Sequence, residues 1–200
     1  MNPIWALVIA ILSSLGGYYI PKLISRSVNS NKSILTYHFN GDSYRELKNI
    51  KHSFGRGVDD IDASNGKAWE HTSQHLDGGE TTCYGPYTKE ISFRGKYKAR
   101  FRIKLCGIKE DADIITLDIA YGEVDTENEK IRLGIVSGER HLRTKDFSDG
   151  KYKDFDVGFE YNGESLLEFR CTVINPVNFT NVVGRILFDN VKVFLVSELT

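Results

Sequence analysis

Residues 34–200 of this chain are predicted to form an all-β fold, a two-sheet antiparallel β-sandwich. One segment, Tyr97–Leu105, alternates strictly between apolar and polar residues, which is the pattern of a strand with one buried and one wet face. Turn residues recur at intervals of about 8–12 residues, and no window after residue 33 has the period of an amphipathic helix. A jelly roll is the first interpretation of this pattern, and an immunoglobulin-like sandwich is the second.

The chain opens on an uncharged segment, Pro3 to Ile20, which Lys22 follows closely. A bilayer core about 30 Å thick needs roughly 20 apolar residues in a helix, and this segment just reaches that length. A cleaved secretory signal is the alternative, but no Lys or Arg precedes the apolar run, as one does in most such signals. We therefore expect a single-pass transmembrane anchor at residues 3–20 and a polar tether at residues 21–33, followed by the β-sandwich domain.

Charge and cysteine content bear on where the domain lies. Lys22, Arg26 and Lys32 all follow the expected anchor, so the positive-inside tendency predicts that the domain is cytoplasmic. The three cysteines are odd in number, widely spaced and without a CxxC pair, which also favours a reducing compartment. A formal net charge of −1 argues against general nucleic-acid binding. The expected location is the membrane, with the domain on its cytoplasmic side.

Strands are expected wherever an apolar-alternating or apolar run lies between turn residues. The strong patterns are Tyr97–Leu105, Asp113–Tyr121, Lys130–Val136, Tyr152–Tyr161, Leu166–Ile174 and Arg185–Val196, and the weaker ones are Ile34–Phe39, Lys67–His71 and Lys89–Phe93. The turn signals that bound them are Asp149-Gly150, Asn162-Gly163, Asn175-Pro176 and Asp189-Asn190. The last strand is strongly apolar, so we expect it to be central in its sheet or paired with the first strand.

The polar face of the first strong strand carries only cations. They are Lys96, Lys98, Arg100, Arg102 and Lys104. Like charges in a row repel, so opposite charges on neighbouring strands ordinarily balance them, and Asp118 and Glu168 lie on strands that could provide them. The alternative is a docking face for an anionic glycan, an acidic protein or a lipid surface. Arg100 and Arg102 are therefore candidate ligand-binding residues.

Two segments resemble the galactose-binding-like jelly rolls found in carbohydrate-binding modules. One is Gly78–Tyr87 with its Tyr-Gly-Pro-Tyr end, followed by Gly95–Arg102, and the other is Phe188–Val193 with its Phe-Asp-Asn-Val start. The resemblance implies a non-catalytic binding module whose ligand is a carbohydrate, and the apolar opening segment would anchor this module to the membrane. The resemblance also implies that a few exposed aromatic side chains hold this ligand. The candidates are Trp69, Tyr84, Tyr87, Tyr121 and Phe179.

The same resemblance implies a structural calcium ion near the last strand. Asp189 matches the position of the acidic ligand, and Asp42 and Glu46 are the available acidic partners. Calcium takes six to eight oxygen ligands, several of them from the backbone. No other cofactor is expected.

Each candidate also has a structural alternative. Trp69 is typical of a core residue, Tyr84 and Tyr87 of a turn, and Tyr121 of a strand end. No GxSxG elbow is present, so we expect that the protein is not an enzyme. If the domain is cytoplasmic, a protein-interaction or scaffold role at the membrane face becomes the alternative to carbohydrate binding. In that case a protein would replace the glycan as partner.

Overall fold

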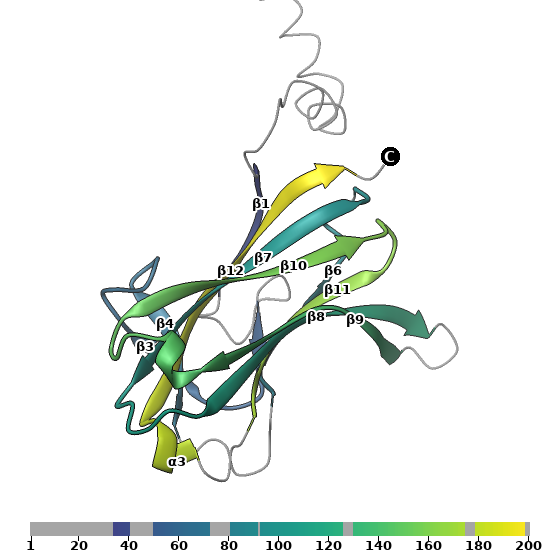
Figure 1. Cartoon of the computed structure of the whole chain (residues 1–200). Helices are drawn as coiled ribbons and strands as arrows, with labels where there is room; N and C mark the ends of the chain where they lie inside the picture. Colours follow the sequence, from purple (N-terminus) through teal and green to yellow (C-terminus); the bar gives the residue numbers. More distant parts are fainter. Residues whose placement is uncertain are drawn as a thin grey trace, which may run out of the picture. The chain divides into compact units, whose positions relative to one another are not determined.

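Two six-stranded antiparallel sheets face one another in the computed structural model, which describes residues 34–40, 50–72, 81–91, 93–125, 130–174 and 179–198 (Figure 1). Sheet 1 has the order β10 (Tyr152–Tyr161), β7 (Gly95–Cys106), β12 (Arg185–Glu198), β4 (Lys67–Thr72) and β3 (Arg56–Asp59), with β1 (Ile34–Asn40) also paired to β12. Sheet 2 has the order β2 (Lys51–His52), β5 (Thr81–Tyr84), β11 (Leu166–Val173), β8 (Asp113–Asp125) and β9 (Lys130–Arg143), with β6 (Pro86–Thr88) also paired to β11. The all-β sandwich predicted from the sequence is confirmed. The described helical turns are a 3-10 turn at Thr144–Asp146 and α3 (Phe179–Val182).

The last strand, β12, is the centre of sheet 1. It pairs with β7 on one side, and on the other side its first half pairs with β4 and its second half with β1. The expectation that this strand is central or paired with the first strand is therefore confirmed in both respects. The turn expected at Asp189-Asn190 is wrong. Both residues are buried inside β12, at a bulge where the register with β7 shifts between Phe188 and Asn190.

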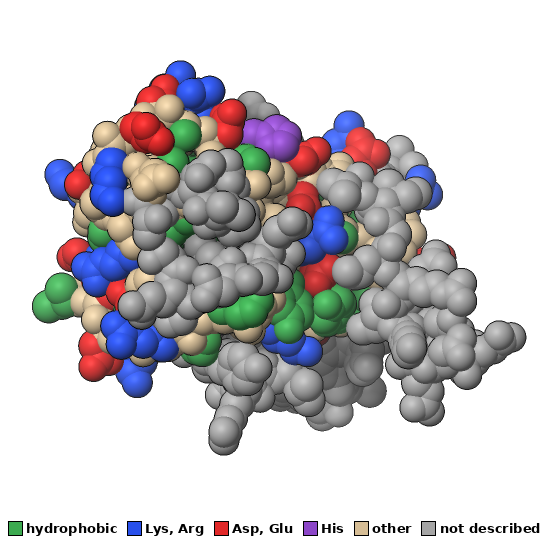
Figure 2. All heavy atoms as spheres, turned by 90° about the horizontal axis from the view of Figure 1, so that it is seen from below, with side chains coloured by type: hydrophobic (Ala, Val, Ile, Leu, Met, Phe, Trp, Pro, Cys, Tyr) green, Lys and Arg blue, Asp and Glu red, His purple; other side chains and the backbone are tan. Residues whose placement is uncertain are grey.

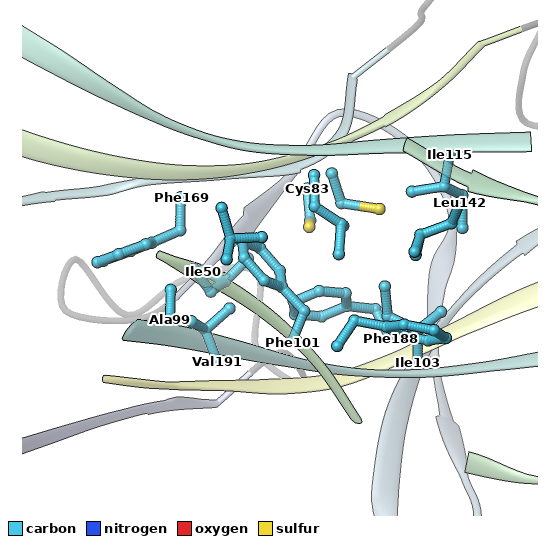
Figure 3. Close-up of a cluster of buried hydrophobic side chains, with 14 of the residues drawn as sticks. Ile50, Cys83, Ala99, Phe101, Ile103, Ile115, Leu142, Phe169, Phe188 and Val191 are labelled. Carbon is cyan, nitrogen blue, oxygen red and sulfur yellow. The ribbon is translucent and has the colours of Figure 1, made fainter. Parts of the chain in front are cut away.

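The core lies between the two sheets and is built from the apolar face of each strand. On β7 the inward side chains are Tyr97, Ala99, Phe101, Ile103 and Leu105, each no more than 2% exposed. This is the alternation that the sequence predicted. Phe101 and Phe188 of sheet 1 meet edge to face, with ring centroids 6.5 Å apart, and belong to the same core as Phe169 of sheet 2 (Figure 3). Cys83 and Cys171 are buried thiols on directly opposite positions of β5 and β11.

One side of the sandwich is closed where β9 of sheet 2 meets β10 of sheet 1. A Cβ on Gly138 would collide with the carbonyl oxygen of Gly158, so only glycine fits at this approach. Ser137 Oγ donates to the carbonyl oxygen of Glu160 at 3.0 Å, and Arg140 Nη1 donates to that of Asp156 at 3.1 Å. Side chains of β9 thus satisfy carbonyl groups on the outer edge of β10, which would otherwise be open for pairing.

The strand boundaries follow local pattern in some places and depart from it in others. The strand expected at Tyr152–Tyr161 has the observed bounds, whereas β9 runs seven residues beyond Val136, to Arg143. The strand expected at Lys89–Phe93 is wrong, since the described residues of that segment are irregular and the preceding strand, β6, ends at Thr88. The Asn175-Pro176 turn, the anchor at residues 3–20 and the tether at residues 21–33 lie outside the described residues. Within the described ranges, no helix combines the length and the apolar character that crossing a bilayer requires.

Candidate functional site

The aromatic residues singled out in the sequence do not share one place. Trp69, on β4, is only 8% exposed, and its ring stacks on His52 at a centroid distance of 4.5 Å. Its Nε1 donates to the carbonyl oxygen of Phe54 at 2.6 Å. Phe179 is fully buried in α3. Tyr121 packs against the core and donates its hydroxyl to Ser137 at 2.8 Å. Trp69 and Phe179 are thus interior residues, and the partly exposed Tyr121 packs against the core.

Tyr84 and Tyr87 are the predicted pair that the structure brings together. Tyr84 ends β5 and Tyr87 lies in β6, their ring centroids are 6.3 Å apart at 63°, and both are partly exposed. Tyr87 has a φ of 61°, and no other non-glycine residue in the described ranges has a positive φ. A left-handed conformation costs an ordinary residue roughly 1–2 kcal/mol. Such strain gathers at ligand sites more often than elsewhere.

Charged side chains of sheet 2 lie on the same outer face as these rings. Alternation along β11 turns Glu168 and Arg170 outward, while their neighbours enter the core. Arg170 Nε donates to Asp118 Oδ1 of β8 at 2.6 Å, across directly opposite positions. The hydroxyl of Tyr87 bonds to Glu168. We call Tyr84, Tyr87, Asp118, Glu168 and Arg170 the tyrosine–carboxylate cluster.

Burial shapes the electrostatics of this cluster. Glu168 is 1% exposed and Asp118 6% exposed, and desolvation raises the pKa of both carboxyl groups. Desolvation and the neighbouring Glu168 also raise the pKa of Tyr87, so its hydroxyl stays a donor at neutral pH. The Oε2 atom of Glu168 is buried and makes no hydrogen bond to any described group. The cluster therefore combines ring faces with hydrogen-bonding groups that are fixed and only partly satisfied.

The cationic face of β7 is balanced by acids, but not by those expected. Asp118 and Glu168 lie on sheet 2, so the prediction that they pair with it is wrong. The acids come mainly from β10, which runs antiparallel beside β7: Lys96–Glu160 at 3.4 Å, Lys98–Asp156 at 3.2 Å, Arg100–Asp156 at 2.7 Å and Arg102–Asp154 at 3.5 Å. We call this row the charge ladder. Arg100 and Arg102 are thus held within their own sheet.

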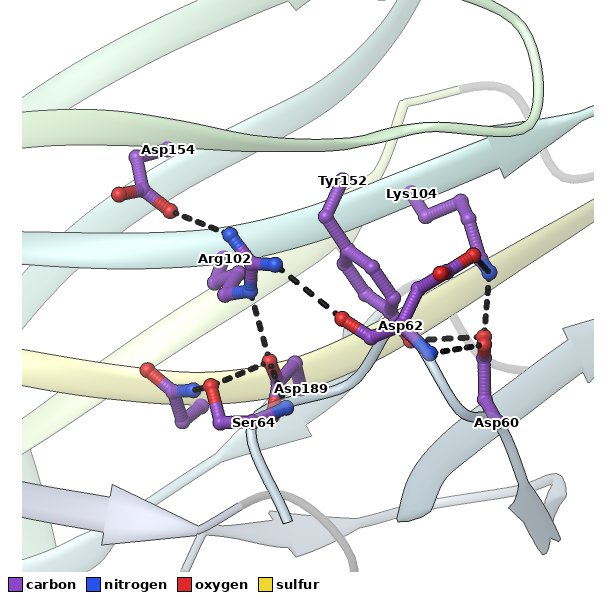
Figure 4. Close-up of polar contacts among 9 residues, drawn as sticks. Asp60, Asp62, Ser64, Arg102, Lys104, Tyr152, Asp154 and Asp189 are labelled. Carbon is purple, nitrogen blue, oxygen red and sulfur yellow. Dashed lines mark hydrogen bonds and ion pairs between the residues drawn. The ribbon is translucent and has the colours of Figure 1, made fainter. Parts of the chain in front are cut away.

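Asp189, the candidate metal ligand, belongs to a network beside this ladder (Figure 4). Its Oδ2 accepts from the backbone N and the hydroxyl of Ser64, at 2.9 and 2.8 Å, and from Arg102 Nε at 2.8 Å. Nearby, Lys104 Nζ lies 2.5 Å from Asp60 Oδ2, to which Tyr152 also donates. These bonds fasten the loop that joins β3 to β4 onto the outer face of sheet 1.

The surroundings of Asp189 do not suit a calcium ion. Its neighbours are donors and a guanidinium, whereas calcium needs a cage of oxygen acceptors. In the described part of the chain, no three His, Cys, Asp or Glu side chains come together as metal ligands. Asp42 and Glu46, the acidic partners expected from the sequence, lie outside that part. The calcium ion expected from the sequence is therefore not tested by the structure, and the effect of a chelator on thermal stability tests it.

Comparisons with known proteins support the fold. No protein-family model matches the chain, and no curated protein matches it significantly. Among solved structures, the CBM22-2 xylan-binding domain of Xyn10C from Paenibacillus barcinonensis has a TM-score of 0.50 and 11% identity, over 80% of this chain and 98% of that one. The CBM22-1 xylan-binding domain of the same protein has a TM-score of 0.48 and 11% identity, over 86% of this chain and 100% of that one.

A family 11 carbohydrate-binding module from Clostridium thermocellum, in complex with a β-1,3-1,4-mixed-linked tetrasaccharide, has a TM-score of 0.45 and 15% identity. It is matched over 85% of this chain and 100% of that one. At 11% identity and a TM-score of 0.50, the likeness to the CBM22-2 domain establishes a shared β-sandwich fold and not a shared ligand.

Proposed function

We propose that the domain is a non-catalytic carbohydrate-binding module of the galactose-binding-like jelly-roll type. Its ligand site is the tyrosine–carboxylate cluster on the outer face of sheet 2. The observation that carries the proposal is the meeting of Tyr84 and Tyr87 with Asp118, Glu168 and Arg170 on one face. The fold shared with a xylan-binding domain supports the same conclusion.

The cluster suits a neutral sugar chain. The rings of Tyr84 and Tyr87 would pack against the C–H face of a pyranose, while the buried carboxylates of Asp118 and Glu168 hold Arg170 and Tyr87 in place. The guanidinium of Arg170 would donate to ring or hydroxyl oxygens. Asp118 is held by Arg170, and Glu168 by Tyr87, so both carboxylates are fixed before a ligand arrives. Preorganisation of this kind lowers the entropic cost of binding.

A protein-interaction or scaffold role is the alternative that the sequence left open, and it depends on the cationic face of β7. Because acids of the same sheet balance most of those cations, we favour a glycan over a protein as the partner. Attachment to the membrane through residues 3–20 and a cytoplasmic location remain proposals from the sequence.

Affinity electrophoresis in gels that contain a neutral, debranched xylan or a mixed-linked β-glucan tests the site. We expect Tyr84→Ala and Tyr87→Ala each to weaken retention about tenfold, because each removes one ring contact worth roughly 1–2 kcal/mol. The matched control is Phe194→Ala, which removes a partly exposed ring from the outer face of sheet 1. Retention that survives both tyrosine variants, in domains that melt cooperatively, would contradict the assignment.

A further inference from the structure

The charge ladder has one gap. Across β7 and β10, Lys96 faces Glu160, Arg100 faces Asp156 and Arg102 faces Asp154. Lys104, at the end of the row, pairs with Asp60 from a loop. Lys98 faces Gly158. Each of the other four cations faces an acid on β10 or pairs with one from a loop. The residue that faces Lys98 is a glycine, which carries no acid.

Lys98 instead shares an acid that is already engaged. Its Nζ lies 3.2 Å from Asp156 Oδ2, but Arg100 holds the two oxygens of that carboxylate through Nε at 2.7 Å and Nη2 at 3.0 Å. The ammonium group also lies over the ring of Phe194, 5.5 Å from the ring centroid. Lys96, Lys98 and Arg100 thus bring three positive charges to a place where Asp156 and Glu160 bring two negative ones.

Open space lies at the position opposite Lys98, where an acid would complete the row. Gly158 is exposed, and a Cβ added to it would meet no atom within 4 Å. A depression of about 570 Å³ opens over this position, within the roughly 300–1,000 Å³ usual for ligand sites. Its walls carry Lys96, Lys98 and Glu160, together with Ser137 and the 57% exposed Val196.

We propose that this depression binds the carboxylate of a hexuronate unit in an acidic polysaccharide, with the carboxylate above Gly158 completing the ladder at Lys98. The inference rests on the proposed carbohydrate-binding function and adds a second, acidic subsite on the opposite sheet. Glu160 supplies acceptors for sugar hydroxyls, and Val196 offers an apolar surface to the C–H face of a sugar ring. This combination favours a charged sugar over an acidic peptide.

A matched pair of polymers tests the proposal: a glucuronate-bearing xylan, and the same xylan after its carboxylates are reduced to alcohols. At low salt we expect the wild-type domain to bind the acidic polymer at least about tenfold more tightly, as one charge-assisted hydrogen bond would give. Added salt lowers this ratio. Gly158→Asp places a carboxylate of the chain itself in the gap and reduces the ratio to near one, while binding of the reduced polymer is unchanged. Gly158→Ala, the control, keeps the ratio.

This experiment distinguishes an error in the proposed tyrosine–carboxylate site from an error in the proposed acidic subsite. Tyr87→Ala weakens binding of both polymers and keeps their ratio, so a Tyr87→Ala variant that binds the reduced polymer normally contradicts the proposed function. An unchanged ratio in Gly158→Asp, or a wild-type ratio of one, overturns the acidic subsite. Competition by poly-glutamate as effective as that by the acidic xylan also overturns it, because the partner class would then be an acidic peptide. Thermal melting verifies that each variant folds.

Discussion

Replacing Asp189 by asparagine removes one buried negative charge and keeps the shape of the side chain. The bonds from Ser64 N, Ser64 Oγ and Arg102 Nε all end on Oδ2, at 2.9, 2.8 and 2.8 Å. An amide oxygen in that place still accepts them but lacks the charge that strengthens the bond from Arg102, and the new NH2 group takes the buried place of Oδ1, which makes no hydrogen bond to any described group. Hydrogen bonds to charged groups contribute about 1.5–3 kcal/mol. Arg102 is 29% exposed and also bonds to Asp154 and to the carbonyl oxygen of Asp62, so the weakening of this one bond leaves it satisfied. We expect Asp189→Asn to lower the free energy of unfolding by about 2 kcal/mol.

The measurement is urea denaturation at pH 7, supported by thermal melting. For a domain of this size, about 2 kcal/mol corresponds to a melting temperature roughly 4–8 °C lower. Asp189→Ala loses the two bonds from Ser64 and the bond from Arg102 altogether and should cost about 4 kcal/mol. The control is a chelator added to the wild-type domain, which should leave its melting temperature unchanged. A chelator that lowers the melting temperature of the wild type but not of Asp189→Asn would refute this reasoning and restore the calcium ion at Asp189.

Two further predictions concern pH and packing. Burial raises the pKa of Glu168 above its unfolded value, so ionisation of this carboxyl group destabilises the folded state. The loss of folding free energy grows as the pH rises from the unfolded pKa to the folded pKa, and it is constant above that. Glu168→Gln should therefore be more stable than the wild type at pH 8, and chemical denaturation should show this gap shrink as the pH falls toward the unfolded pKa of a glutamate, about 4.3. A gap that widens on acidification contradicts this. Gly138→Ala should cost about 1–3 kcal/mol, because its Cβ meets the carbonyl of Gly158. Gly158→Ala has no such contact and should be near neutral, so equal melting temperatures for the two alanine variants would count against the close approach of β9 and β10.

Alternation along single strands could be read from the sequence. The inward and outward residues of Tyr97–Leu105 are as predicted, because a period of two needs no knowledge of the neighbours. The acids that face the cations could not be predicted in this way. They depend on β7 lying between β10 and β12, strands that are distant in sequence. Asp189-Asn190 shows the same limit, since a pair typical of turns forms a bulge within a central strand.

The candidate site was predictable only in part. Tyr84 and Tyr87 are three residues apart, and local chain geometry suffices to bring them together. Alternation along the sequence predicts that Glu168 and Arg170 lie on one strand face. Their proximity to Asp118 depends on the pairing of β8 with β11, which the sequence does not predict. Trp69 is of a residue type that stacks on sugars. Its burial, which excludes it from such a site, arises only in the assembled fold and could not be predicted from the local sequence.

The described residues on the face shown in Figure 2 include cations, anions and scattered apolar side chains, so the distribution of residue types does not identify a binding face. Titration of the isotope-labelled domain with a neutral xylo-oligosaccharide, followed by backbone amide resonances, selects it directly. The account predicts shifts concentrated on β5, β6, β8 and β11 around Tyr84, Tyr87 and Arg170. Shifts confined to β7, β10 and β12, or no shifts at millimolar ligand, would contradict a carbohydrate site on the outer face of sheet 2.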